Sequence, residues 1–418
     1  MAEAPPHRRS IAIAALSTVV EWYDFTLYLY FSTVLARVFF GGGAAGLAAA
    51  LGGFAVAYLM RPIGAAAFGH LGDRRGRRPM LLISMALMSL AMLLTGLLPT
   101  QAQIGPAAAW LLVLLRCVMG FSVGGEYTGV VAYLLENAPA NRRGLVASFA
   151  AAASEVGALL AVGISALTVS ATSEPQLQAW GWRIPFLFGA ALAATVWLAR
   201  STMAESPDFE RQRAEGSIPA NPLLHALSGQ RWGVVRSFAI SALGSITYYV
   251  GITYVPAFLT SAGTASETVS LWLSTIAAVA VIAVTPLVGL LSDRYGRKPV
   301  LLALAGLSVV LPVSMFSLMT GSTGAALIGA VLLALMAGGV SAVGAVATAE
   351  QFTGEARVSG LALGATMATA IFGGFTPWLA QALIGATGWS EVPGVLIALV
   401  ALCVMPVFVR MRETRPVN

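Results

Sequence analysis

Six ionisable residues lie within long apolar stretches of this sequence, where a charge is expensive to bury. They are Glu21, Asp24, Arg61, Arg116, Glu126 and Glu155. An acid or base in such surroundings is a candidate for ligand binding or proton transfer, because its ionisation depends strongly on the groups beside it. All six lie in the first half of the chain, so this chemistry is expected to be concentrated there.

The four acids among them are predicted to exchange protons. They are Asp24, Glu21, Glu126 and Glu155. Glu21, Asp24 and Tyr28 share one face of a helix, because they follow one another at intervals of three and four residues. An acid close to Arg116 could load a proton in one conformation and release it in another.

Arg116 and several tyrosines are predicted to bind a ligand. Arg116 keeps its charge and can hold a carboxylate through two parallel hydrogen bonds, although a fixed ion pair with one of the acids is the alternative. Tyr248 and Tyr249 could line a cavity or hold a cation against their rings, and ordinary helix packing is the alternative for each. The predicted binding set is Arg116, Tyr28, Tyr127, Tyr248 and Tyr249.

The composition places these residues in a membrane. Hydrophobic residues make up 58% of the 418 residues and charged residues 10%, with a mean hydropathy of +0.82. A soluble domain carries about 25% charged residues, so this chain could not solvate its own surface in water. The net charge of +6 is distributed in a way that suits membrane topology rather than nucleic-acid binding.

Metal, disulfide and enzyme chemistry are not expected. Both cysteines, Cys117 and Cys403, lie inside apolar stretches, so neither a disulfide nor a metal site is expected, and no cofactor is predicted. The three histidines, His7, His70 and His225, lie in or beside polar segments. An enzyme inside a membrane would need a nucleophile with a base, or a metal cluster, at depth, so the sequence predicts no enzyme.

The apolar stretches predict an all-α integral membrane protein with twelve transmembrane helices. A bilayer core of about 30 Å is crossed by roughly 20 apolar residues. The predicted helices cover about 11–36, 47–70, 79–99, 107–135, 144–170, 183–200, 234–260, 269–291, 299–320, 324–348, 358–385 and 389–410. Twenty of the 24 basic residues then fall on one side, the cytoplasmic side by the positive-inside rule. Both termini are therefore predicted to be cytoplasmic.

One long polar connection divides the chain. It contains several acids and arginines followed by Pro219 and Pro222, and it falls between the sixth and seventh predicted helices. The prediction is therefore an N-terminal six-helix bundle over residues 1–200, a cytoplasmic linker over 201–232 and a C-terminal six-helix bundle over 233–418.

A polar motif occurs twice, between the second and third predicted helices of each half. Residues 69–79 (GHLGDRRGRRP) return as residues 289–299 (GLLSDRYGRKP), with seven identical positions 220 residues apart. Gly76 and Gly296 suit a tight turn, and Pro79 and Pro299 suit the first turn of the helix that follows it. Asp73 and Asp293 are predicted to lie at the N-terminus of that following helix, where the helix dipole favours an anion.

These motifs resemble the signature of the major facilitator superfamily, and further stretches resemble its metabolite–proton symporter branch. The further stretches are residues 21–25 (EWYDF), 60–64 (MRPIG), 120–129 (GFSVGGEYTG) and 181–186 (GWRIPF). The resemblance covers essentially the whole chain. It implies two six-helix bundles around a central cavity, alternating access to that cavity, and uptake driven by a proton gradient.

The resemblance also implies a charged network at the cytoplasmic surface, which acts as a gate. Its predicted members are Asp73, Arg74, Arg77 and Glu136 in the first half, and Asp293, Arg294, Arg297 and Glu350 in the second. Arg61 lies close to the first motif, and it is expected to belong to this network rather than to the ligand site.

Members of the branch carry organic acids or zwitterions such as proline and betaine. A small organic acid is favoured here, because Arg116 can neutralise a carboxylate in a cavity. Residues 370–375 (AIFGGF) resemble organic-acid members, whereas the run from Tyr248 to Pro256 resembles proline/betaine members, so a zwitterion is the alternative. An uncoupled facilitator, an exporter and a channel are further alternatives. The expected partners are a small-molecule substrate, protons and the lipid of a bacterial inner membrane, with no nucleic acid and a monomeric state.

Overall fold

Helices make up nearly all of the chain that the structure, a computed structural model, describes. The described residues are 8–75, 77–124, 140–201, 231–352 and 364–415, and they contain no strand. A chain inside a bilayer must satisfy its backbone hydrogen bonds internally, and a helix does so within a single segment. The predicted all-α class is therefore confirmed.

The first half consists of long helices joined by short ones. The long helices are α1 (Arg8–Tyr30), α3 (Gly43–Arg75), α4 (Arg77–Leu97), α6 (Ala107–Ser122), α8 (Arg143–Ala171) and α10 (Arg183–Ser201). The short elements are α2 (Ser32–Phe39), α5 (Gln101–Ile104), η1 (Ala140–Arg142), α9 (Glu174–Gln176) and η2 (Leu177–Gly181).

The second half repeats this plan, with two stretches of π-helix inside its spans. Its elements are α13 (Arg231–Tyr248), η3 (Tyr249–Thr253), α14 (Val255–Ser261), α15 (Glu267–Tyr295), α16 (Arg297–Met319), α17 (Thr323–Ala349), η4 (Thr369–Phe375), α19 (Thr376–Thr387) and α20 (Val392–Arg410). The π-helices are η3 and η4. Such turns widen a helix locally and are frequent at functional sites.

Each of the twelve predicted membrane helices has a counterpart among the described residues. Nine of the described helices are long and apolar enough to cross a membrane, and α13, η3 and α14 together form a tenth span that bends by 45°. The two others are α1, where Glu21 and Asp24 lower the hydropathy, and α6, whose described part has 16 residues.

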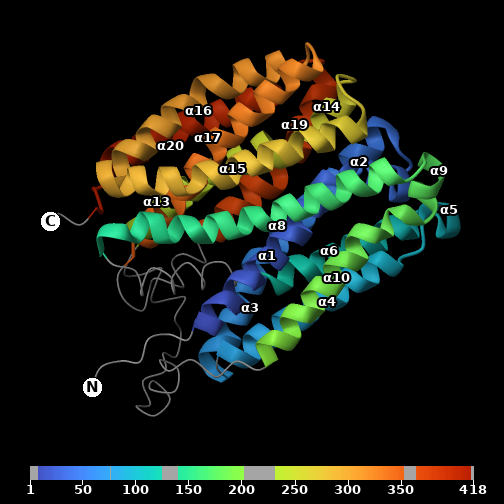
Figure 1. The fold of residues 1–418 in the computed structure, drawn as a ribbon, viewed down its shortest axis with the longest axis horizontal. Coiled ribbons are helices and arrows are strands. Elements are labelled where there is room, and N and C mark those ends of the chain that lie inside the picture. Colours follow the sequence, from blue (N-terminus) through green and yellow to red (C-terminus); the bar gives the residue numbers. More distant parts are fainter. Residues whose placement is uncertain (1–7, 76, 125–139, 202–230, 353–363, 416–418) are drawn as a thin grey trace.

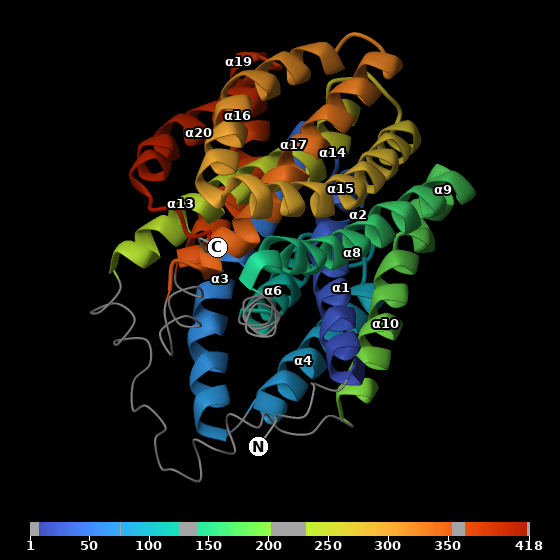
Figure 2. The same ribbon diagram turned by 60° about the vertical axis from the view of Figure 1, so that its left-hand side comes forward.

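The helices form two groups that meet along a shared face. In Figures 1 and 2 the blue-to-green helices of the first half lie together, and the yellow-to-red helices of the second half lie beside them. α8 and α15 run alongside one another where the halves meet. The turn between α15 and α16 marks one end of the molecule, called here the hairpin end, and α2 and α9 lie at the opposite, far end (Figure 1).

Small residues allow α8 and α15 to approach closely at the hairpin end. A Cβ atom built on Gly144 would lie 2.5 Å from Ser292 Oγ and 2.8 Å from the carbonyl oxygen of Gly289. A Cβ atom on Gly289 would lie 2.5 Å from Ser148 Oγ. Small residues of this kind let membrane helices pack backbone against backbone.

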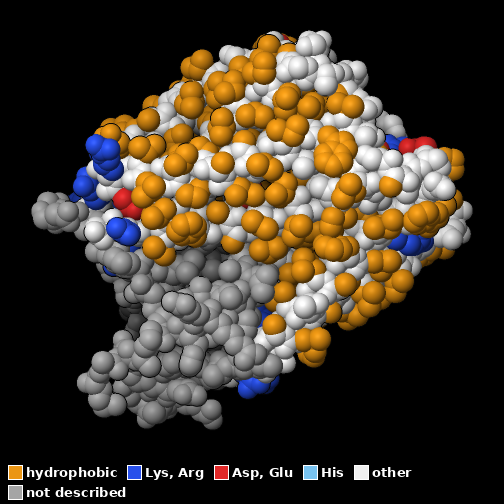
Figure 3. Space-filling model, in the orientation of Figure 1, with side chains coloured by type: hydrophobic (Ala, Val, Ile, Leu, Met, Phe, Trp, Pro, Cys, Tyr) orange, Lys and Arg blue, Asp and Glu red, His pale blue; other side chains and the backbone are white. Residues whose placement is uncertain are grey.

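The outer surface matches a lipid environment. Figure 3 shows apolar side chains spread over the helices, with the visible charged side chains at the ends of the molecule. Large apolar side chains such as Trp110, Val310 and Leu287 are exposed by 75%, 66% and 60%. A soluble monomer rarely exposes so continuous an apolar surface, whereas lipid tails cover one readily.

Candidate functional site

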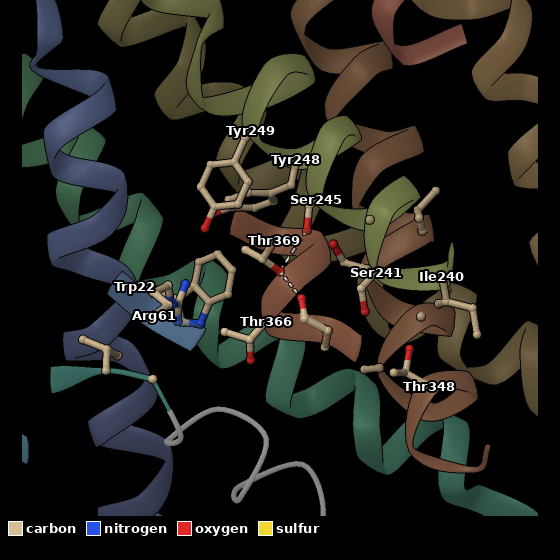
Figure 4. A pocket seen from close by; sticks show the side chains of 18 residues that line it. Trp22, Arg61, Ile240, Ser241, Ser245, Tyr248, Tyr249, Thr348, Thr366 and Thr369 are labelled. Carbon is tan, nitrogen blue, oxygen red and sulfur yellow. Dashed lines mark hydrogen bonds between the residues drawn. The ribbon is translucent and has the colours of Figure 1, made fainter. Parts of the chain in front are cut away.

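A cavity of about 160 Å³ lies between the two halves. Its lining includes Trp22 of α1, Arg61 of α3, Ser241, Ser245 and Tyr248 of α13, Tyr249 of η3, Ser341 and Thr348 of α17, and Thr366 and Thr369 near η4. Figure 4 shows Trp22 and Arg61 on one side of this space and the hydroxyl groups of α13 on the other. The cavity therefore combines one guanidinium, several hydroxyls and a set of aromatic rings.

The aromatic rings form a wall contributed by both halves. The Trp22 and Tyr248 rings meet edge-on with centroids 5.2 Å apart, and Trp22 and Tyr249 stack at 6.4 Å. Tyr249 also shares a hydrogen bond with the hydroxyl of Tyr58 on α3. Gly373 lets η4 approach this wall, since a Cβ atom there would lie 2.6 Å from the Tyr249 ring. The rings are thus held in place by contacts across the interface between the halves.

Arg61 lies on the cavity wall and holds Glu21. Its Nη2 donates to Glu21 Oε1 at 2.5 Å, its Nη1 donates to the Tyr58 hydroxyl at 3.3 Å, and its guanidinium lies 4.6 Å from the centre of the Phe25 ring. The expectation that Arg61 belongs to the surface network rather than to the ligand site is wrong. Arg61 falls inside the apolar span Gly43–Phe68 of α3, before the polar motif begins.

Arg116 lies deep within the first bundle and binds Asp24. Its Nη1 donates to Asp24 Oδ2 at 2.8 Å and its Nη2 to Thr95 Oγ1 at 3.2 Å, and the two charged side chains are 4% and 0% exposed. Neither residue lines the cavity. The Arg116 guanidinium also lies over the ring of Tyr28, 5.7 Å from the ring centre. The Tyr28 hydroxyl donates to the carbonyl of Ala50 at 2.9 Å. The structure thus unites Arg116, Asp24 and Tyr28, but away from the cavity.

The remaining predicted proton-exchange and binding residues fall into two groups. Glu155 of α8 is buried, 3% exposed, and faces Tyr248 of the cavity wall. Glu126 and Tyr127 lie outside the described residues. Their roles, and the linker over 201–232, which lies almost wholly outside the described ranges, remain predictions.

At the hairpin end the structure brings together three of the predicted gate residues of the second half. Arg297 Nη1 donates to Asp293 Oδ1 at 2.9 Å, and Arg297 Nε donates to Glu350 Oε2 at 3.2 Å. Arg297 is fully buried, and these two acids compensate its positive charge. The Arg294 guanidinium instead lies over the ring of Tyr295, at 5.4 Å. In the first half, the side chains of Asp73, Arg74 and Arg77 and all of Glu136 lie outside what the structure describes.

Asp293 caps a different helix from the one predicted. Its two carboxylate oxygens accept from the backbone N–H groups of Gly144 and Leu145 at 2.8 and 2.9 Å, at the start of α8 in the other half. The prediction that Asp293 lies at the N-terminus of the following helix is therefore wrong. Glu413 occupies that position instead, accepting from the backbone N–H of Arg297 at 2.9 Å.

The turn before α16 explains why Glu413 fits there. Gly296 has a φ of +101°, a conformation that other residues resist, and a Cβ atom on it would lie 2.6 Å from Glu413 Oε2. Glu413 also accepts from the backbone N–H of Lys298 at 3.0 Å. Several backbone N–H groups at a helix start form a ready anion site, which the carboxylate of Glu413 fills.

A second charged cluster joins the halves at the far end, and it was missed from the sequence. Arg37 of α2 binds Glu267 at the start of α15 at 2.7 Å, and it binds Glu174 of α9 at 2.8 Å. Thr33 donates a further hydrogen bond to Glu267. The only signal in the sequence is that Arg37 departs from the cytoplasmic bias of the other basic residues.

No cluster of three or more His, Cys, Asp or Glu side chains suited to a metal ion occurs in the described ranges. The cavity wall offers one arginine paired with a carboxylate, aromatic rings and hydroxyls, while the Arg116–Asp24 pair lies apart from it.

Comparisons with known proteins match the chain along most of its length. Residues 10–230 match the family described as "Sugar (and other) transporter", and residues 259–418 match the "Major Facilitator Superfamily". The chain is 35% identical over 419 residues to the "Ectoine/proline transporter ProP" of Corynebacterium glutamicum. This alignment covers 94% of this chain and 82% of that protein. It is 31% identical over 389 residues to the "Citrate-proton symporter" of Klebsiella pneumoniae, with coverages of 92% and 87%.

A solved structure has the same fold. The xylose transporter XylE from E. coli, in a partially occluded inward-open conformation, superposes with a TM-score of 0.79 at 20% sequence identity. The superposition covers 98% of this chain and 99% of that one.

Proposed function

Because the chain belongs to the major facilitator superfamily, we propose that it imports a small zwitterion bearing a carboxylate together with protons, by alternating access. Membership makes the chain a multi-pass membrane transporter and not an enzyme, and it confirms the predicted major facilitator fold. The substrate class, the proton coupling and the orientation are the proposed parts.

The observation that carries the proton coupling is the ion pair between Asp24 and Arg116. It is buried within one bundle, and Asp24 Oδ1 has no hydrogen-bond partner among the described residues. A proton on Asp24 would remove the partner of a buried guanidinium, and such a loss is costly enough to favour a different packing of the helices. The protonation state of Asp24 would thereby shift the conformational equilibrium, as symport requires. The citrate relative is itself named as a proton symporter.

The cavity lining supports a zwitterion over an organic acid. The sequence favoured an organic acid because Arg116 could neutralise it, but Arg116 is engaged by Asp24 and lies outside the lining. Arg61 is the one guanidinium among the described lining residues, and Glu21 already balances its charge. A ligand with no net charge suits such a wall better than an anion, because no positive charge is left uncompensated to offset its desolvation. The relative from Corynebacterium is named for ectoine and proline.

Contacts at both ends support alternating access. The far end is held by Arg37 and Glu267, and the hairpin end by Asp293 at the start of α8. If the halves rock against each other, the contacts at the far end and those at the hairpin end would break alternately. By the positive-inside rule, the hairpin end is cytoplasmic. We place the protein in the inner membrane of a bacterium, as a monomer.

The proposal is tested by uptake into proteoliposomes with an imposed pH gradient. Labelled proline, glycine betaine, ectoine, citrate and α-ketoglutarate are offered separately, with and without a protonophore. Accumulation of a zwitterion that the protonophore abolishes is expected. Accumulation of the organic acids alone would overturn the substrate class, and accumulation that survives the protonophore would overturn the proton coupling.

A further inference from the structure

In the described part of the chain, a single charged side chain lines the cavity. It is Arg61, which lies with Trp22 on one side of the space in Figure 4. Arg61 is 8% exposed, and its Nη2 donates to Glu21 Oε1 at 2.5 Å. The Glu21 side chain is 1% exposed and does not belong to the lining. The cavity therefore meets a positive charge that is compensated by a buried carboxylate behind the wall.

Side chains of α1 and α3 hold the guanidinium in one orientation. Arg61 Nη1 donates to the Tyr58 hydroxyl at 3.3 Å, and the guanidinium carbon lies 4.6 Å from the centre of the Phe25 ring and 5.2 Å from that of Tyr58. The Tyr58 hydroxyl in turn shares a hydrogen bond with Tyr249 of the second half. A group that is fixed before binding loses little freedom when a ligand arrives. Arg61 is therefore preorganised for a ligand in the cavity.

The guanidinium keeps hydrogen-bond donors for such a ligand. An arginine side chain carries five N–H groups, and the bonds to Glu21 and Tyr58 use two of them. A carboxylate matches a planar guanidinium through charge-assisted hydrogen bonds. Because Arg61 lines the cavity and Arg116 does not, a substrate carboxylate in this cavity has its strongest partner in Arg61.

The pairing of Arg61 with Glu21 determines the net charge that the cavity tolerates. A zwitterion adds no net charge to the pair, so its carboxylate binds Arg61 while the total stays at zero. An anion without a cationic group would place a second carboxylate around one guanidinium, with no further positive side chain in the described lining to compensate it. An uncompensated charge in dry surroundings is costly, so the pair disfavours the anion.

We propose that Arg61 binds the carboxylate of the substrate, and that Glu21, acting through Arg61, restricts the site to ligands without a net negative charge. This inference rests on the proposed function, because it assigns the carboxylate end of the transported zwitterion to Arg61 and the charge selection to Glu21.

Three compounds built on the same five-membered ring provide matched probes. Proline is a zwitterion, cyclopentanecarboxylate lacks the ammonium, and prolinamide lacks the charge of the carboxylate. Their dissociation constants are measured at pH 7 by calorimetry on the purified full-length protein. The wild-type protein is expected to bind proline about 10- to 100-fold more tightly than either of the other two compounds.

Glu21→Gln tests the charge selection. The amide keeps the size of the side chain but leaves the charge of Arg61 without its carboxylate partner. The preference for proline over cyclopentanecarboxylate is therefore expected to fall by about 10-fold or more, because the anion now supplies the missing negative charge. A merely structural role for Glu21 would weaken the binding of both compounds and leave their ratio unchanged.

The double variant Glu21→Gln with Arg61→Gln tests the carboxylate site without leaving a lone buried charge. It removes the guanidinium and its partner together, so a loss of folding through an unpaired charge is avoided. The preference for proline over prolinamide is expected to fall to near one. Thermal unfolding of each purified variant checks that it is folded.

Tyr58→Phe is the matched control. It removes a hydrogen bond from the same guanidinium and changes no charge. Both ratios should therefore equal those of the wild type, even where the affinities themselves change.

The outcomes separate this inference from the proposed function. If the uptake assay shows accumulation of a zwitterion but the wild type binds proline and cyclopentanecarboxylate equally, the charge selection is overturned and the proposed function stands. Accumulation of organic acids alone overturns both. A Glu21→Gln protein that keeps the wild-type ratio but loses proton-driven accumulation would make Glu21 a proton carrier and overturn its role here. Equal binding of proline and prolinamide by the wild type, or binding of none of the three probes at millimolar concentrations, overturns the carboxylate site.

Discussion

Asp293 on α15 accepts a hydrogen bond from the backbone N–H of Gly144, 2.8 Å away at the start of α8, so a carboxylate of one half caps a helix of the other. The same carboxylate pairs with Arg297, which is tied in turn to Glu350. The repeated motif therefore does more than turn the chain. It joins the cap between the halves to the charged network within the second half.

Replacing Asp293 by asparagine is expected to weaken this contact. The amide side chain could accept one hydrogen bond but would bring no charge to the helix N-terminus or to Arg297, so we expect a loss of about 1–2 kcal/mol in the stability of the closed hairpin end. The measurements are hydrogen exchange of the first turn of α8 and initial uptake rates, and both should change. Glu391→Gln, at the opposite end of the molecule, is the control. Unchanged exchange in α8 would contradict the role given to Asp293.

Replacing Asp24 by asparagine is expected to abolish proton-driven accumulation. Asparagine cannot bind and release a proton, so the substrate should equilibrate across the membrane and no longer concentrate. Counterflow of labelled against unlabelled substrate should persist, because it requires no net proton movement. Proteoliposomes with Tyr254→Phe, which leaves the pair intact, provide the comparison. Accumulation at the wild-type level by the Asp24→Asn protein would remove Asp24 from the coupling.

Replacing Arg116 by lysine is expected to affect stability more than substrate affinity. Lysine keeps the charge beside Asp24 but cannot maintain the paired bonds to Asp24 and Thr95, which should cost about 1 kcal/mol. Because Arg116 lies outside the cavity lining, the dissociation constant should change by less than about threefold, or 0.7 kcal/mol. Calorimetry and thermal unfolding in the same detergent measure the two effects. A tenfold weaker affinity would show that Arg116 contacts the substrate.

Glu413 should make the attachment of the final segment dependent on pH. Burial raises the pKa of this carboxyl, but the backbone N–H groups of Arg415, Arg297, Lys298 and Thr414 outweigh it and hold the pKa below its usual value of 4.5. The folded pKa is therefore lower than the unfolded one. The resulting stability is complete above the unfolded value and is lost as pH falls through the folded value.

The test compares Glu413→Gln with the wild type at several pH values. The variant should melt at a lower temperature at pH 7, and the difference should shrink as the pH falls below about 4. Thermal unfolding of the purified protein measures it. A difference that stays constant down to low pH would mean that the charge of Glu413 is not what holds the segment.

The sequence predicted the spans well, because the bilayer imposes a length that apolar stretches reveal directly. It could not predict which charges meet. Glu21 and Asp24 are three residues apart and were expected on one face, yet about 60° of helix rotation separates them. That rotation is enough to direct Glu21 to Arg61 and Asp24 to Arg116, partners 40 and 92 residues away.

The binding groups were partly visible and partly hidden. Tyr248 and Tyr249 were identified because aromatic pairs are rare enough to notice, and both line the cavity. The hydroxyls of Ser245 and Thr369 carry no such signal, since serine and threonine are common in membrane helices and usually bond to their own backbone. The two π-helices that carry Tyr249 and Thr369 each end shortly before a proline, Pro256 and Pro377, which lacks the N–H of the next helical hydrogen bond; a proline in a span predicts a local irregularity but not a π-helix at a given residue.

Because Gly144 and Gly289 approach closely, a substitution at either position can be used to select one conformation of the protein. A methyl group on either glycine would meet atoms of the facing helix at 2.5–2.9 Å, distances at which something must shift. An alanine at either position would therefore penalise this packing of the two halves, while any arrangement that separates α8 from α15 at the hairpin end would be spared. A change of one methyl group is thus expected to favour a state in which the hairpin end is open, without a ligand and without replacing a charged residue.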